Sequence, residues 1–196
     1  MEPQKKLGIY IDVSNIELGL ADYNCEGMCL DYSQLIRQVS QGYSLTVLRG
    51  YDSYVKEGQS LTDIQQVLKN AGVELVLYES QRGNNRFGEC EIHQKEVDTG
   101  LVADVCWDLA SGTVDSAIIV SGDRDMRPAY ARAKKAGCEV KILTLRCAIQ
   151  DNYYLSLDDC LLIEDYEAFL LSGEVKDGVC FNVASFPIME GVKADE

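Results

Sequence analysis

Short apolar segments alternate with segments of helical periodicity along most of this 196-residue chain. The intervening segments place hydrophobic residues three and four positions apart, as on one face of a helix. Strands and helices that alternate through short connections form a parallel sheet covered on both faces. We therefore expect strands at residues 7–12, 44–53, 73–79, 115–122, 138–145 and 161–165, and helices at residues 31–41, 60–72, 97–112 and 123–137.

This pattern predicts an α/β fold, a three-layer α/β/α sandwich with a mostly parallel central sheet of the Rossmann-like kind. A hydrophobic content of 46% suffices for a sizeable core. We expect one domain over residues 1–172, followed by a tail or edge extension at 173–196, where the alternation stops. The polar segment "SQRGNNRFGECEIHQK" (80–95) is expected to be a loop or a short hairpin.

The cellular compartment can be inferred from what the chain lacks. No segment is long and apolar enough to span a membrane, and "MEPQKKLGIYID" lacks the apolar block of a signal peptide. The eight cysteines include no C-x-x-C pair, and "CEGMC" (25–29) has a spacing found at zinc sites but lacks further ligands nearby. Reduced core thiols fit better, so we expect a cytoplasmic protein.

Acidic residues follow two of the predicted strands. Asp12 ends the first strand in "IYIDVSN", and Asp123 follows the fourth in "IIVSGDRDM". Ligands of open parallel sheets bind outside the carboxyl ends of the strands, so both acids would meet there if these strands are neighbours. Asp98 and Asp104 belong to the helix before the fourth strand, but lie about 240° apart around an ideal helix axis.

Acids converging in apolar surroundings repel one another unless a cation lies among them. Mg²⁺ or Mn²⁺, which prefer oxygen ligands, would relieve that repulsion. Each acid also has an ordinary explanation when taken alone, since Asp12 could be a turn residue and Asp98 or Asp123 a helix cap. Asp125 in a first helical turn is favoured by the helix dipole whatever the function. Their joint placement at strand ends favours a cation site.

Three segments resemble the motifs of a known family. "IYIDVSNIELGL" is similar to the opening of NYN domains, a branch of the PIN-like nuclease superfamily, and "KEVDTGLVADVCWDLA" resembles the corresponding segment of the LabA-like bacterial members. "AIIVSGDRDMRPAYARAKKAGCEVKIL" is similar to the family's "VSGDSDF" region. The motifs occur in family order over about residues 7–170. The family's glycines are replaced by Val13 and Glu96, and its aromatic residue by Met126.

The resemblance implies a PIN-like fold and Mg²⁺- or Mn²⁺-dependent ribonuclease activity. By motif position, the implied catalytic and metal-binding residues are Asp12, Asp98, Asp104 and Asp123, with Asp125 as a further metal ligand. Asn15 and Ser121 match family positions that could contact a water or a phosphate. The implied reaction is attack of water on an RNA phosphodiester bond.

The net charge of −14 opposes non-specific binding of nucleic acid, so RNA would need a local site and would bind weakly and salt-sensitively without metal. Basic residues near the expected site are Lys95, Arg124 and Arg127, with Arg82 and Arg86 in the polar segment. Tyr78, Phe87 and Tyr130 could stack on bases of single-stranded or structured RNA. His93, the chain's one histidine, is expected to be an ordinary loop or strand residue.

Two other functions compete with a nuclease. A non-catalytic, metal-binding regulatory module would act through a protein or RNA partner, but the intact set of acids favours an enzyme. A phosphatase of the haloacid-dehalogenase type would need D-x-D after the first strand, where this chain has Asp12-Val13-Ser14. Whether the chain forms a homodimer is left open by the sequence.

Overall fold

The computed structural model describes residues 3–24, 28–54, 59–84, 90–93, 95–149, 158–171 and 180–181, with side chains over 3–21, 30–54, 59–80, 96–149 and 158–168. Six parallel strands form the central sheet in the order β4-β3-β1-β7-β8-β9. These strands are β1 (Lys6–Asp12), β3 (Ser44–Tyr54), β4 (Glu74–Glu79), β7 (Ser116–Val120), β8 (Glu139–Thr144) and β9 (Cys160–Leu162). The predicted fold class is confirmed, and β1 lies beside β7, with Ile11 opposite Val120.

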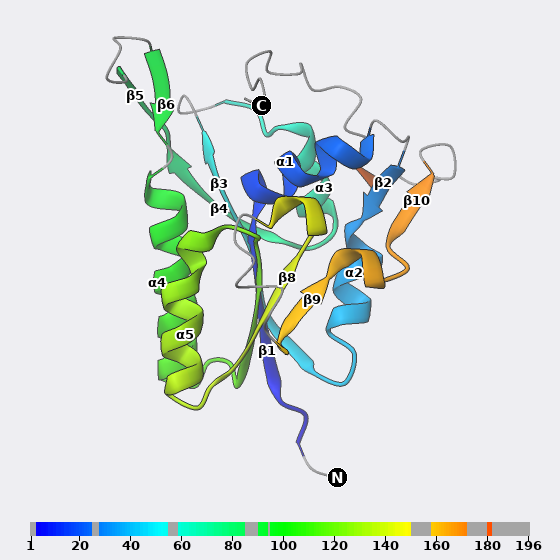
Figure 1. Ribbon diagram of the computed structural model, residues 1–196, viewed down its shortest axis with the longest axis vertical. Helices are drawn as coiled ribbons and strands as arrows, with labels where there is room; N and C mark the ends of the chain where they lie inside the picture. The colour runs from blue at the N-terminus through cyan, green and yellow to red at the C-terminus, as the bar shows by residue number, and fades with distance from the viewer. Residues whose placement is uncertain are drawn as a thin grey trace, which may run out of the picture.

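Helices cover both faces of this sheet, which gives three layers (Figure 1). One face is covered by α1 (Val13–Asn24), α2 (Tyr32–Val39) and α3 (Asp63–Asn70). The other is covered by α4 (Lys95–Ser111) and α5 (Arg127–Lys135), which lie side by side. Both central strands are buried almost throughout, as expected of a parallel sheet covered on both sides.

The helix ends follow local rules. Asp31 caps α2 by accepting a hydrogen bond from the Gln34 backbone, and Thr62 and Gln65 form a capping box at the start of α3. The predicted helix at residues 123–137 is divided into a 3₁₀ turn, η1 (Arg124–Met126), and α5, with Pro128 in the first turn of α5.

Smaller elements complete the fold. The polar segment contains a hairpin of β5 (Gln81–Asn84) and β6 (Cys90–His93), one of the two expected alternatives. A separate antiparallel sheet joins β2 (Met28–Asp31) to β10 (Phe169–Leu171) and to β11 (Cys180–Phe181) from the tail region. Two further 3₁₀ turns are η2 (Arg146–Ala148) and η3 (Ile163–Asp165). Within the described residues, every helix is too short or too polar to cross a lipid bilayer.

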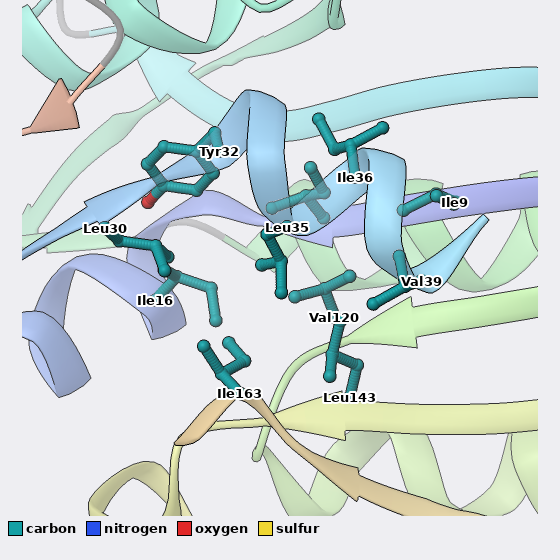
Figure 2. A pocket seen from close by; sticks show the side chains of 11 residues that line it. Ile9, Ile16, Leu30, Tyr32, Leu35, Ile36, Val39, Val120, Leu143 and Ile163 are labelled. Atoms are coloured by element: carbon teal, nitrogen blue, oxygen red, sulfur yellow. The ribbon is translucent and has the colours of Figure 1, made fainter. Parts of the chain in front are cut away.

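The core between the sheet and α1–α2 encloses a small apolar cavity of about 10 Å³ (Figure 2). Aliphatic side chains surround it, among them Ile9, Leu35 and Val120 from three different elements. A space of this size holds at most about one water molecule, and an apolar lining offers that water no hydrogen-bond partners. The cavity is therefore a packing feature of the core.

Leu35 should contribute strongly to stability because its side chain is buried between α2 and the sheet. We expect Leu35→Ala to lower the free energy of unfolding by about 2–5 kcal/mol, the cost of lost burial plus a cavity. Leu18→Ala is the matched control, since Leu18 is 75% exposed and should change stability by less than about 0.5 kcal/mol. Urea unfolding of both variants tests this, and equal effects would contradict the packing described.

Candidate active site

The carboxylate of Asp12 is buried where the ends of β1 and β7 meet α1. Its Oδ2 accepts a hydrogen bond of 2.9 Å from the Ser121 hydroxyl, and its Oδ1 accepts one of 3.1 Å from the backbone N–H of Asn15. Only 4% of the residue is exposed. Two neighbouring strand ends and the first turn of a helix therefore fix this acid in one orientation.

Three more acidic residues lie close enough to Asp12, or to one another, to affect a pKa in this region. The pKa of Asp12 is raised to about 6, mainly by burial and also by the charges of Asp98 and Asp123, although the two hydrogen bonds lower it. Burial also raises the pKa of Asp98, with added repulsion from Asp123 and Asp125. We call Asp12, Asp98, Asp123 and Asp125 the acidic site.

Asp123 is both a cap and a member of the acidic site. Its Oδ1 accepts a 2.9 Å hydrogen bond from the backbone N–H of Asp125, which starts η1. Capping uses one carboxylate oxygen, so the cap explanation from the sequence holds without removing Asp123 from the site. The two explanations are compatible.

Asp104 is bound elsewhere. Its Oδ2 accepts hydrogen bonds from the Tyr51 hydroxyl at 2.8 Å and from Arg49 at 3.5 Å. One turn later, Asp108 is bound by Arg49 at 3.1 Å and by the Tyr10 hydroxyl at 2.9 Å. The structure therefore brings Asp98 to the acidic site and Asp104 to Arg49, because their side chains leave α4 in different directions.

Asn15 and Ser121, both expected to contact substrate, are engaged by the protein itself. The Asn15 side-chain oxygen accepts a 2.7 Å hydrogen bond from the backbone N–H of Gly122, and the Ser121 hydroxyl accepts one of 3.1 Å from Asp123 while donating to Asp12. These contacts hold the turn after β7 against α1. Gly122 is required there, since a Cβ would lie 2.2 Å from the carbonyl oxygen of Ala148.

The other predicted substrate contacts divide into exposed, buried and undescribed residues. Arg124 and Arg127 are exposed beside the acidic site. Tyr130 is 4% exposed and its hydroxyl donates to Asp159, so the prediction that it stacks on bases is wrong. Tyr78 is half-buried, with its hydroxyl close to Gly100 on α4. The side chains of Lys95, Arg82, Arg86, Phe87 and His93 lie outside the described residues.

One strand-end acid was missed by the sequence interpretation. Asp52, in β3, is 5% exposed and accepts hydrogen bonds from Gln65 Nε2 at 2.6 Å and from the Ser14 hydroxyl at 3.3 Å. Its contacts come from α1 and α3, so it lies on the face of the sheet opposite the acidic site. Burial, with the charge of Asp52, raises the pKa of neighbouring Glu17 to about 7. The strand-end rule applied to "RGYDS" would have identified Asp52.

The donor chemistry of the acidic site fits a hard divalent cation. Its carboxylates repel one another in a half-buried space, and a positive charge would remove that cost. Across the described residues, no three His, Cys, Asp or Glu side chains lie close enough together to hold a metal ion. Mg²⁺ usually takes one or two protein carboxylates and keeps several waters, so the acids present suit a water-rich ion.

Without a bound metal ion, ionisation of Asp12 should lower the free energy of unfolding. Its folded pKa of about 6 exceeds the usual 3.8, so the unfolding free energy should fall as pH rises through that window. Asp12→Asn keeps an acceptor for Asn15 and should stabilise the protein at pH 7.5 in a chelator by about 2–3 kcal/mol. The gain should shrink towards pH 4. Chemical denaturation at both pH values tests it, and a gain that does not vary with pH would contradict the assignment.

Comparison with known proteins identifies the family. Residues 6–155 match the NYN domain, and that match covers most of the chain and every member of the acidic site. Searches of curated proteins and of solved structures gave no significant match. The six-stranded parallel sheet with helices on both faces agrees with the PIN-like α/β fold of that family. The chain therefore belongs to the NYN domain family, a family of PIN-like nucleases.

Proposed function

We propose that this protein is a metal-dependent endoribonuclease that hydrolyses RNA phosphodiester bonds at the acidic site. The observation that carries the proposal is the buried carboxylate of Asp12, fixed by two hydrogen bonds and repelled by Asp98 and Asp123. A protein that needed these residues only for folding would gain by neutralising them. The repulsion of the buried Asp12 carboxylate by Asp98 and Asp123 supports a role in binding a cation.

Asp12 and Asp123 are the proposed principal ligands, with Asp98 and Asp125 binding directly or through water. A bound Mg²⁺ or Mn²⁺ supplies positive charge for the phosphodiester and lowers the pKa of a water molecule. Ser121 and the Asn15 backbone N–H orient the Asp12 carboxylate, and Asn15 fixes Gly122 and thereby the start of η1. Asp104, in contact with Arg49 and Tyr51, positions α4 in this proposal.

Several finer features belong to the same proposal. The segment "KEVDTGLVADVCWDLA" favours the LabA-like branch of the family. Arg124, Arg127 and Lys95 are the proposed phosphate contacts for single-stranded or structured RNA. We place the catalytic domain within residues 1–172, with 173–196 as an extension, and expect it to act in the cytoplasm.

A second function is a metal-binding regulatory module without catalysis, acting through a protein or RNA partner. The observation in its favour is Glu96, which replaces a glycine of the family motif and adds a further negative charge to the first turn of α4. Cleavage assays separate the two functions.

The proposed activity predicts cleavage of labelled single-stranded RNA with Mn²⁺ or Mg²⁺ and none with EDTA. Asp12→Asn and Asp123→Asn should each lower the rate by about two orders of magnitude or more, because each removes a metal ligand. Asp115→Asn is the matched control, since Asp115 is exposed at the opposite end of β7. Cleavage that survives in both site variants would reveal a contaminant and reject the proposal.

Asp104→Asn distinguishes the two possible ligand sets. Retained metal-dependent cleavage would assign Asp104 to the Arg49 contacts, whereas a loss as large as that of Asp12→Asn would make it a ligand. Melting temperatures measured with and without Mn²⁺ provide a readout independent of catalysis, because an ion that binds the folded state stabilises it. Wild type stabilised by Mn²⁺ but inactive on every RNA would support the regulatory module.

A further inference from the structure

The densest run of basic residues along the chain forms η1 and α5. Residues 124–135 contain five of the chain's 18 Lys and Arg residues and one acid, in a protein with a net charge of −14. Arg124, Arg127, Arg132, Lys134 and Lys135 are all exposed. We call these five residues the α5 basic strip.

The strip begins at the acidic site and leads away from it. Asp123 caps η1, so Arg124 directly follows a residue of the acidic site. From there α5 runs alongside the strands towards their amino ends (Figure 1). At about 1.5 Å per residue in α5 and about 2 Å in η1, the strip is about 20 Å long. A strand of nucleic acid advances about 3.4 Å per nucleotide when stacked, so this length corresponds to about six nucleotides.

Helix geometry arranges the basic side chains along the outside of α5. Ala129 and Tyr130 face the core, whereas Lys135 projects from the opposite side, with Arg132 on one flank and Arg127 on the other. Lys134 lies on the same flank as Arg127 and contacts Asp159 at 2.6 Å. The exposed half of α5 is therefore basic on both flanks and on its outer side, and α5 itself contains no acidic residue.

The helix dipole explains only part of this charge. Basic residues in a last turn are favoured by the dipole, which accounts for Arg132, Lys134 and Lys135 without any ligand. Arg124 and Arg127 lie at the opposite, positive end, where the dipole disfavours them. Cations at both ends of one helix point to a surface for an extended polyanion.

We propose that the α5 basic strip binds the phosphate backbone of the RNA flanking the cleaved bond. This inference rests on the proposed ribonuclease function for its substrate. The net charge of the protein is negative, and the acidic site itself repels phosphate. Binding to the strip would overcome both, because the cations of α5 attract the phosphates next to the cleaved bond. The strip reads no sequence, because contacts to phosphates position a nucleic acid without selecting its bases.

The test is the double variant Arg132→Gln/Lys135→Gln, compared with Arg37→Gln/Lys69→Gln. Arg37 and Lys69 also lie in the last turns of helices, α2 and α3, but on the other face of the sheet. Both double variants therefore change the net charge by the same amount and remove the same favourable dipole contacts. The full-length chain is used, in an Asp12→Asn background to keep the RNA intact.

Binding of a single-stranded RNA of about twelve nucleotides is measured by fluorescence anisotropy over a series of salt concentrations. Loss of two phosphate contacts should reduce the slope of log K against log salt by about 1.4 and weaken binding about 10- to 30-fold near ~0.1 M salt. The α2/α3 control should keep the parental slope. Equal slopes for the two double variants would overturn the inference.

Cleavage assays separate this inference from the proposed function. With Asp12 restored, Arg132→Gln/Lys135→Gln should reduce the preference for RNA of about twelve nucleotides over RNA of about four, measured as a ratio of kcat/KM. An unchanged preference with normal metal-dependent cleavage would overturn the strip and leave the ribonuclease intact. A changed binding slope without any cleavage would support the strip as an RNA surface and reject the enzyme.

Discussion

The hydrogen bond from Ser121 to Asp12 is the contact on which the rest of the site depends. It joins the ends of β7 and β1, and the same hydroxyl accepts from Asp123. Asn15 adds a second link, because its backbone binds Asp12 and its side chain binds Gly122. Hydrogen bonds to a charged group are worth about 1.5–3 kcal/mol each, enough to hold a buried carboxylate that would otherwise turn towards solvent.

The acidic residues of α4 have two different sets of neighbours. Asp98 contributes unpaired charge to the acidic site, whereas Asp104 and Asp108 meet Arg49, which also contacts Glu74 of β4. Arg49 thus links β3 to the helix and to the neighbouring strand. The repulsion within the acidic site would loosen the start of α4, and these contacts about two and three turns later hold the helix on the sheet.

The succession of strands along the chain and the position of Asp12 and Asp123 at strand ends could be predicted from sequence, because periodicity and strand-end rules are local; that β1 lies beside β7 could only be stated as a condition. The partner of Asp104 could not, since Arg49 lies 55 residues earlier and nothing local pairs them. The helix α1 was not predicted, since it starts directly after β1 and contains Gly19, and its capping residue is Asp12, the last residue of that strand. Asn15 holds the turn after β7 through a hydrogen bond from the backbone N–H of Gly122, 107 residues later in the chain. A motif position alone does not reveal this contact.

Gly122 limits where sequences can vary beside the acidic site. A Cβ at this position would lie 2.2 Å from the Ala148 carbonyl oxygen of η2 and 2.7 Å from the Thr144 hydroxyl. The turn after β7 therefore has no room for a side chain at this position. Substitutions that changed the proposed substrate would have to occur in α4, η1 and α5, whose side chains have exposed positions near the acidic site.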